Sequence, residues 1–347
     1  MKVVVDNKIP YIKEAIEAIA DEVIYAVGSE FTPELVKDAD ALIVRTRTQC
    51  NQHLLEGSKV QFIATATIGY DHIDTEYCKA AGIEWINAPG SNAASVGQYI
   101  ESVFLLLEQE RGLKLQKCTI GIIGVGSVGS KVETVARKYG MRVLLNDLPR
   151  EDAEGKSYFS TLKEIASECN IITFHVPLNK EGSYKTLHLA DQAFFDSLTR
   201  TPVLINTSRG EVIDTEALLA AIDNRQVSQT VIDVWENEPD INPELLEKCW
   251  IGTPHIAGYS ADGKANATRM ALKALCAHFD KPFEYKINPP APEETVIKAT
   301  TEAEALLHIY DPRQDSERLK TEPQLFEYFR GNYPLRREKK AYEIEIE

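Results

Sequence analysis

The sequence predicts an α/β fold with two doubly wound parallel-sheet domains, a cleft between them and a small C-terminal α+β domain. Three observations lead to this prediction. Short apolar runs alternate with amphipathic helical stretches through most of the chain, a pattern typical of parallel sheets covered by helices on both faces. A glycine-rich turn joins two of these runs near residue 124, as in Rossmann-like domains. Beyond residue 282 the chain becomes proline-rich and then charged and aromatic.

The first 93 residues predict one α/β unit. Its strand-like apolar runs span residues 3–5, 41–44 and 62–66. Amphipathic stretches at 11–20 and 33–37 separate these runs and predict helices on the faces of the sheet. An apolar helix expected at 94–110 joins this unit to the next one.

The glycine cluster Gly124-x-Gly126-x-x-Gly129 lies between apolar runs at 119–123 and 142–145. A strand, a tight turn, a helix and a second strand in this order form a dinucleotide-binding fingerprint. Gly124 permits the turn, Gly126 lets backbone N–H groups approach a pyrophosphate, and Gly129 lets helix and strand pack closely. The helix N-terminus adds partial positive charge for the phosphates.

Asp147 follows the second of these runs, 18 residues after Gly129. A carboxylate at this position can accept hydrogen bonds from the ribose hydroxyls, and its charge repels a 2′-phosphate. No arginine follows directly, since Leu148 and Pro149 come next. The sequence therefore predicts NAD rather than NADP as the cofactor, and the spaced acid argues against a glycine turn of merely structural origin.

Four more strand-like runs complete the second sheet, and a returning helix closes the first domain. The strands are expected at 171–174, 203–205, 230–233 and 250–252, and the helix at 265–279. The predicted domains are a discontinuous substrate-binding domain of residues 1–93 and 257–280, an NAD-binding domain of residues 94–256, and a C-terminal domain of residues 281–347. The extended linker before the last domain predicts that it can be removed cleanly.

Three chemically active side chains each follow a strand of the cofactor domain. Arg209 stands in N-T-S-R-G, Glu238 in D-V-W-E-N-E-P and His255 in T-P-H-I-A-G. Ligands of open α/β sheets bind outside the carboxyl ends of the strands, so the three side chains are expected to converge on the nicotinamide. Taken alone, Arg209 could be a surface arginine, Glu238 a loop carboxylate and His255 a helix-capping histidine. Three such residues at successive strand ends favour catalysis instead.

Hydride transfer from an alcohol to NAD needs a base for the hydroxyl proton and a cation for the substrate. Arg209 can fork onto a carboxylate and polarise the neighbouring oxygen. His255 can act as the base in oxidation and as the acid in reduction. Glu238 can hold the tautomer of the imidazole and favour its protonation.

These motifs, in this order after G-V-G-x-V-G, resemble those of the NAD-dependent D-isomer-specific 2-hydroxyacid dehydrogenases. The resemblance covers about residues 1–280 and implies that Arg209, Glu238 and His255 are the catalytic trio. Further stretches, including V-D-N-K-I-P-Y, H-I-A-G-Y-S-A-D-G-K and the tail's F-R-G-N-Y-P-L-R-R-E, resemble one branch of the family. Its members oxidise 4-phospho-D-erythronate to 2-oxo-3-hydroxy-4-phosphobutanoate in pyridoxal 5′-phosphate synthesis and form homodimers through the C-terminal domain.

The resemblance also implies binding positions. Substrate contacts are expected at Thr46, Thr67 and Tyr259, and Arg45 is added as a phosphate ligand because it directly follows a strand. Cofactor contacts are expected at Gly124, Gly126, Ser127, Val128, Gly129, Asp147, Val176, Thr207, Ser208, Arg209, Asp233 and Gly258. Val176 stands where the family has a hydroxyl residue, so a backbone contact would survive there and a side-chain contact would not.

Composition narrows the partners. The net charge of −15 argues against nucleic acid or an anionic membrane as a partner. The six cysteines are scattered without a CxxC pair, which predicts reduced thiols in a cytoplasmic protein and no metal site. No apolar run is long enough to span a membrane.

Several alternatives stay open. The substrate could be another D-2-hydroxyacid such as 3-phosphoglycerate, or the chain could be an NAD(H)-sensing binding protein, which the complete trio disfavours. His72 reads as a structural histidine. The basic run at 336–340 reads as a solvated face, with Arg336 and Arg337 as a second source of phosphate ligands in a dimer. Packing of a small core or a dimer contact is expected for the tail aromatics Phe326, Tyr328, Phe329 and Tyr333.

Overall fold

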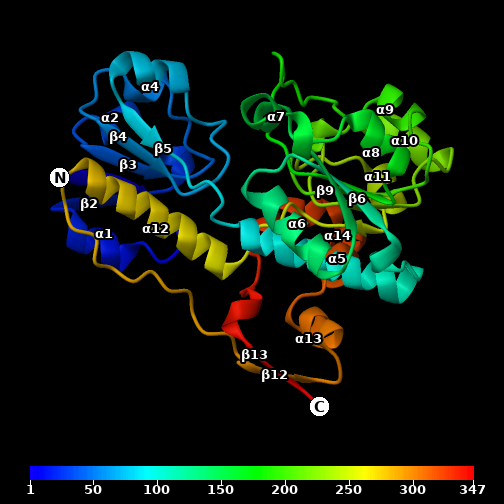
Figure 1. Cartoon of the computed structure of the whole chain (residues 1–347). Helices are drawn as coiled ribbons and strands as arrows, with labels where there is room; N and C mark the ends of the chain where they lie inside the picture. The colour runs from blue at the N-terminus through cyan, green and yellow to red at the C-terminus, as the bar shows by residue number, and fades with distance from the viewer. The chain divides into compact units, whose positions relative to one another are not determined.

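The computed structural model describes residues 1–347, except for the side chain of Lys156. The chain divides into two compact units (Figure 1). The first consists of residues 1–92 and 260–292, and the second of residues 93–259 and 293–347. Among the helices so described, none is both long and apolar enough to cross a membrane.

The first unit is a five-stranded parallel sheet with helices on both faces (Figure 1). Its strands, in the order β2-β1-β3-β4-β5, are Glu22–Ala26, Lys2–Asp6, Ala41–Val44, Phe62–Thr65 and Glu84–Ile86. Its helices are α1 (Lys13–Ile19), α2 (Pro33–Val36), α3 (Gln52–Leu55), α4 (Thr75–Ala81) and α12 (Ala261–His278). The helix expected to return to this unit is therefore α12, which follows the second sheet in the sequence.

Alternate residues of the central strands pack against opposite helix layers, as strand geometry requires. Val3 lies in one buried cluster with Ile16 of α1 and Leu272 of α12. Val4 lies in the other, with Leu54 of α3. The two strands that sequence reasoning missed, β2 and β5, are the edges of this sheet. Most of their residues are only half-buried. β5 is a three-residue strand that begins with a glutamate, whereas β2 does contain an apolar run at residues 23–26, which sequence reasoning overlooked.

The second unit contains a six-stranded parallel sheet in the order β11-β10-β9-β8-β6-β7. These strands are Ile251–Gly252, Gln229–Ile232, Val203–Asn206, Ile171–Phe174, Thr119–Ile123 and Arg142–Asn146. Its helices are α5 (Ala93–Arg111), α6 (Ser127–Lys138), α7 (Leu148–Glu154), α8 (Leu162–Glu168), α9 (Gln192–Asp196), α10 (Thr215–Asp223) and α11 (Pro243–Lys248). The order of the strands reverses between β6 and β8, which is where ligands of doubly wound sheets bind.

The tail after residue 293 adds a small α+β segment to the second unit. Strand β12 (Val296–Ala299) pairs in parallel with β13 (Glu343–Ile346). Between them lie α13 (Glu302–Ile309), α14 (Pro312–Thr321) and α15 (Phe326–Gly331). Leu319 and Phe326 are fully buried in the core cluster that also holds strands and helices of the cofactor sheet. The prediction of a cleanly removable tail is therefore wrong, because its removal would expose that core.

Arg336 corrects the reading of the basic run as a solvated face. Its side chain is 5% exposed and donates to the carbonyl oxygens of Ser95, at 2.6 Å, and Ile256, at 3.3 Å. Its guanidinium also lies 3.7 Å from the ring centre of Tyr310. The carbonyls and the ring that hold this charge are distant in sequence, so the local run of charges gave no sign of them. Arg336 cannot serve as a phosphate ligand for a neighbouring subunit while it is buried here.

Candidate active site

The glycine turn has the shape that a bound dinucleotide requires. Gly124 has φ +87°, and a Cβ on it would lie 2.6 Å from the carbonyl of His175. A Cβ on Gly129 would lie 2.0 Å from the carbonyl oxygen of Gly124, so helix α6 can approach the strand only at a glycine. A Cβ on the exposed Gly126 would meet nothing within 4 Å. Protein packing therefore requires glycine at two of these positions, whereas the space beside Gly126 is open, as the approach of a pyrophosphate would need.

The first turn of α6 supplies donors beside this turn. The first hydrogen bond of the helix runs from Ser130 N–H to the carbonyl of Gly126. The N–H groups of Ser127, Val128 and Gly129 precede it and have no carbonyl one turn back in the helix. Gly126 and Ser127 are exposed. This set of N–H groups and the helix dipole fit the pyrophosphate of NAD.

Asp147 follows β7 directly, as predicted, and it also braces the glycine turn. Its Oδ2 accepts from Val125 N–H at 2.7 Å, and its Oδ1 accepts from Arg150 N–H at 3.1 Å. Carboxylate oxygens have further lone pairs that ribose hydroxyls can use. Arg150 is the nearby cation, but Glu154 holds it through two hydrogen bonds of 2.6 and 2.8 Å. Because Arg150 is paired with Glu154, the 2′-hydroxyl of a bound adenosine ribose would lie beside the Asp147 carboxylate and not beside an unpaired arginine.

His175 follows β8 across the switch point, and sequence reasoning missed it. Its ring bonds to the hydroxyl of Thr173 at 2.9 Å and to that of Thr207 at 3.2 Å. Burial lowers the pKa of His175 to about 3, so the imidazole is neutral in the physiological range. The ring thus holds Thr207, an expected cofactor contact. The side chain of Val176, also an expected contact, lies directly against Gly124. The position of His175 directly after a strand was the signal in the sequence that could have identified it.

Glu238 and His255 form the central contact of the site. His255 Nδ1 lies 2.8 Å from Glu238 Oε2, and the other carboxylate oxygen accepts from Trp235 N–H at 3.0 Å. Burial raises the pKa of Glu238, but the hydrogen bond and charge of His255, the Trp235 N–H and the charge of Arg330 outweigh it, so the net pKa is lowered. The carboxylate is therefore ionised and can order the histidine tautomer.

Asp233 holds the loop that carries His255. It is 1% exposed, and its carboxylate accepts from the Thr253 hydroxyl at 2.7 Å and from the N–H groups of Ile256 and Ala257 at 2.8 and 3.0 Å. His255 itself has φ +57°, a left-handed conformation that a residue with a Cβ adopts only when its surroundings impose it. The side-chain contacts of Asp233 thus fix the backbone of the loop that carries His255.

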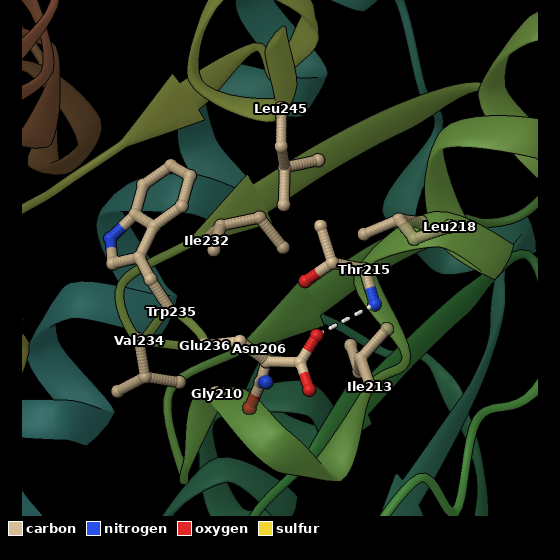
Figure 2. A pocket seen from close by; sticks show the side chains of 10 residues that line it. All are labelled: Asn206, Gly210, Ile213, Thr215, Leu218, Ile232, Val234, Trp235, Glu236 and Leu245. Carbon is tan, nitrogen blue, oxygen red and sulfur yellow. Dashed lines mark hydrogen bonds between the residues drawn. The ribbon is translucent and has the colours of Figure 1, made fainter. Parts of the chain in front are cut away.

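Arg209 lies on a loop that packs directly against the loop of Glu238. A Cβ on the next residue, Gly210, would lie 2.0 Å from the carbonyl carbon of Trp235, so the two loops meet backbone to backbone (Figure 2). Arg209 Nη1 donates to the carbonyl of Ser208 at 2.7 Å, and the Asn206 side chain donates to the carbonyl of Arg209 at 2.9 Å. The sequence motif N-T-S-R-G is therefore a rigid turn with the guanidinium at its end.

Glu236, on the same loop as Glu238, makes a second set of contacts. Glu236 accepts from Thr215 N–H at 3.0 Å, the bond drawn in Figure 2, and its other oxygen lies 2.7 Å from His188 Nε2. The small cavity between them is lined mostly by apolar side chains, including Ile232 and Leu245. None of the trio lines this cavity.

Tyr259 lies four residues after His255, and the tail reaches it. Its hydroxyl accepts from Arg330 Nε at 3.1 Å, and its ring meets that of Tyr333 edge-on at 6.1 Å between centres. Arg330 Nη1 also lies 3.8 Å from Glu238 Oε2. Sequence reasoning gave Arg330 no role, and its motif F-R-G-N-Y-P carried no local sign of one. Gly258, an expected cofactor contact, lies partly exposed beside Tyr259.

The remaining expected substrate contacts lie in the first unit. Arg45 follows β3, is partly exposed and donates to the carbonyl of Lys8 at 3.2 Å. Thr46 is exposed. Thr67 donates to the carbonyl of Gly69 at 2.8 Å and lies 2.6 Å from the hydroxyl of Thr65.

His72 is a structural residue, as the sequence indicated. It is 5% exposed, and its Nε2 lies 2.9 Å from the same Thr65 hydroxyl. Burial lowers its pKa.

Comparisons with known proteins decide the family. A family model described as the NAD binding domain of D-isomer specific 2-hydroxyacid dehydrogenases matches residues 98–257, and a model described as a domain of unknown function matches residues 291–347. The erythronate-4-phosphate dehydrogenase of Bacteroides thetaiotaomicron is 67% identical, over 99% of this chain and 99% of the relative. This chain belongs to the erythronate-4-phosphate dehydrogenase family. The enzyme of that name from Porphyromonas gingivalis is 42% identical, over 99% of this chain and 95% of the relative.

Solved structures agree with the 2-hydroxyacid dehydrogenase fold. The D-lactate dehydrogenase of Aquifex aeolicus, crystallised with NAD and lactic acid, matches with a TM-score of 0.65 and 25% identity, over 81% of this chain and 96% of that one. The NAD⁺-bound 3-phosphoglycerate dehydrogenase of Entamoeba histolytica matches with a TM-score of 0.66 and 27% identity, over 81% and 95%. The predictions of parallel-sheet α/β domains with a small C-terminal α+β segment, of an NAD-dependent oxidoreductase and of NAD as its cofactor are confirmed.

Proposed function

We propose that this member of the erythronate-4-phosphate dehydrogenase family oxidises 4-phospho-D-erythronate to 2-oxo-3-hydroxy-4-phosphobutanoate with NAD, as a step towards pyridoxal 5′-phosphate. The observation that carries the chemistry is the 2.8 Å contact between Glu238 and His255 beside the cofactor loops. The name of relatives 66% and 67% identical to this chain over almost their full length supports the substrate.

The chain's own residues supply the proton chemistry. The ionised Glu238 accepts a hydrogen bond from Nδ1–H of His255, which leaves Nε2 with its lone pair for the substrate. His255 then takes the proton of the 2-hydroxyl as that hydroxyl becomes a carbonyl. Arg209 holds the substrate carboxylate and polarises the 2-oxygen. Bound NAD would supply the hydride acceptor for carbon 2.

The expected cofactor contacts support one binding mode for NAD. The pyrophosphate would lie on the N–H groups of the turn from Gly124 to Gly129, and Asp147 would accept the adenosine ribose hydroxyls. Thr207, Ser208 and Arg209 would border the nicotinamide end, held there by the loop contacts of Asn206 and Gly210.

The phosphate of the substrate needs cations of its own, because Arg209 serves the carboxylate end. Arg45 is the first candidate, with Thr46, Thr67 and Tyr259 as further substrate contacts. Burial lowers the pKa of Lys264 on α12, and the positive charge of Arg45 lowers it further. The positive charges of Arg45 and Lys264 repel one another, and a phosphate bound near both would relieve that repulsion.

The test is NAD reduction measured with 4-phosphoerythronate, 3-phosphoglycerate and unphosphorylated D-lactate. The proposal requires the highest kcat/KM with 4-phosphoerythronate. A preference for 3-phosphoglycerate would replace the substrate but keep the chemistry. NADH binding without turnover on any of the three would favour an NAD(H)-sensing protein.

The proposal also includes a homodimer formed through the tail, in the cytoplasm. The exposure of Tyr328, whose side chain is 60% accessible, supports a contact surface on α15. Six cysteines without disulfides support a reducing compartment. Light scattering at several protein concentrations tests the dimer, and a Tyr328→Glu variant should shift the mass towards that of the monomer.

A further inference from the structure

Arg330 connects the C-terminal tail to the catalytic pair. It lies on α15, and its side chain is only 24% exposed. Its Nε donates to the hydroxyl of Tyr259 at 3.1 Å, and its Nη1 lies 3.8 Å from Glu238 Oε2. The same oxygen of Glu238 receives His255 Nδ1 at 2.8 Å. One carboxylate oxygen therefore lies between the imidazole and the guanidinium.

We infer that Arg330 is a positioning residue for the acid–base pair: it holds the Glu238 carboxylate and the Tyr259 hydroxyl in place and opposes excess positive charge on His255. The inference rests on the proposed function, in which His255 takes the proton. It gives the tail a part in catalysis that is independent of any role in forming a dimer.

The geometry explains why a cation is useful here. Glu238 is 17% exposed, and a carboxylate so far from water needs several donors to stay ionised. Trp235 N–H serves one oxygen, and His255 and Arg330 approach the other. Without Arg330, the ionised carboxylate would depend on His255 for its only charged partner, and an imidazolium would be favoured.

Tyr259 gives the tail a second point of contact. The Arg330 hydrogen bond fixes the hydroxyl, and the Tyr333 ring packs edge-on against the Tyr259 ring. Both contacts come from the tail, and both act on a residue expected to bind substrate. The loop from Pro254 to Tyr259 is thus held by Asp233 on one side and by the tail on the other.

Other charges near the pair act in known directions. Asp233, on the strand-end loop, favours the imidazolium of His255, and Glu327 of α15 lies 3.6 Å from Arg330 Nη1. Arg330 is the charge among these that disfavours the imidazolium. Its loss should therefore let His255 hold its proton to higher pH. The loss of Glu238 should do the opposite, which separates the two effects.

The experiment compares Arg330→Gln, Arg330→Lys and, as a matched control, Arg318→Gln, which removes an exposed arginine from the same tail. For oxidation, kcat/KM is measured against pH, together with the melting temperature. Arg330→Gln should move the acidic limb of the profile to higher pH by up to about one unit and lower kcat/KM roughly tenfold. Arg330→Lys should restore the position of the limb, because it restores the charge. Arg318→Gln should match the wild type.

The inference would be overturned if the acidic limb of the pH profile stayed in place in Arg330→Gln and if Arg330→Lys had no higher kcat/KM than Arg330→Gln. That result would show that Arg330 only packs the tail. A second measurement does not require turnover. NMR titration of His255, assigned with His255→Gln, should show a midpoint at higher pH in Arg330→Gln than in the wild type, and an unmoved midpoint also counts against the inference. A wild type without activity on any hydroxy acid would refute the proposed function, while this titration would still decide the role of Arg330.

Discussion

His255 Nδ1 lies 2.8 Å from Glu238 Oε2, and this one contact determines which nitrogen of the imidazole is available for chemistry. Glu238 accepts a hydrogen bond from Nδ1–H, so Nε2 carries the lone pair. The contact is held from both ends. Trp235 N–H holds the carboxylate, and the buried Asp233 holds the backbone of the histidine loop.

The first prediction concerns this pair. His255→Ala should lower kcat by about 10²- to 10⁴-fold, the usual contribution of general acid–base catalysis. Glu238→Gln should lower it less and move the acidic limb of the pH profile to lower pH, because the imidazolium loses its carboxylate partner. Steady-state rates from pH 5 to 9 check both variants. Near-normal kcat in His255→Ala would remove this residue from the role of the base.

The same pair predicts a pH dependence of stability. The pKa of Glu238 is lowered in the folded protein, so its stabilising effect is present above the unfolded carboxyl range and is lost as pH falls through the folded-state value. Thermal unfolding of wild type and Glu238→Gln should therefore differ at neutral pH and converge in acid. A constant difference across this range would show that the carboxylate charge is not what stabilises the loop.

The glycine turn predicts two different defects for the same substitution. Gly129→Ala should destabilise the fold, because its Cβ would lie 2.0 Å from the carbonyl oxygen of Gly124. Gly126→Ala should leave the melting temperature unchanged, because its Cβ would meet nothing within 4 Å, yet weaken NAD binding by obstructing the ligand. Calorimetry for stability and NADH fluorescence for binding check the pair. Equal effects of the two variants on NAD affinity and on melting would contradict the model of binding.

Cofactor preference depends on Asp147. Asp147→Ala should weaken NAD binding and narrow the preference over NADP, since the carboxylate both contacts the ribose and repels a 2′-phosphate. The variant also loses the bond to Val125 N–H, so some of the loss should appear with NADP too. Dissociation constants for NADH and NADPH separate the two effects. An equal or better wild-type rate with NADP than with NAD would contradict the role assigned to Asp147.

Arg209, Glu238 and His255 could be proposed as a trio from the sequence because each lies in a short motif directly after a strand. Parallel topology then brings the strand ends to one edge of the sheet, so Arg209, Glu238 and His255 needed no long-range information. The glycine turn was predictable for the same reason. His175 also follows a strand, but its role depends on Thr207, which lies 32 residues away. Its part in the site could not be read from its own surroundings.

The tail shows where sequence reasoning reaches its limit. Arg330 meets Tyr259 across 71 residues, and Arg336 meets Ser95 across 241. No periodicity or spacing encodes such pairs, because they depend on how the tail packs on α5 and the cofactor sheet. A charge run with buried partners looks the same in sequence as one in water.

The phosphate end of the substrate gives a prediction for the first unit. Arg45→Ala should raise KM for 4-phosphoerythronate much more than for an unphosphorylated analogue, because only the first carries the charge that Arg45 would bind. Lys264→Met tests the neighbouring cation in the same way and, with a similar length, keeps most of the packing. Equal losses on both substrates would show that Arg45 supports the fold and that the phosphate ligands lie elsewhere.

Truncation of the tail is the last prediction, and it differs from what a simple linker would allow. Removing the residues after 292 takes Leu319 and Phe326 out of the core of the cofactor unit and leaves its buried face exposed. The truncated chain should therefore melt at lower temperature and aggregate, not persist as an active monomer. Tyr328→Glu is the matched control, because it alters an exposed part of the tail without opening that core. If the truncated chain were stable and monomeric with a normal pH profile, the shared core would not matter and Arg330 would have no part in catalysis.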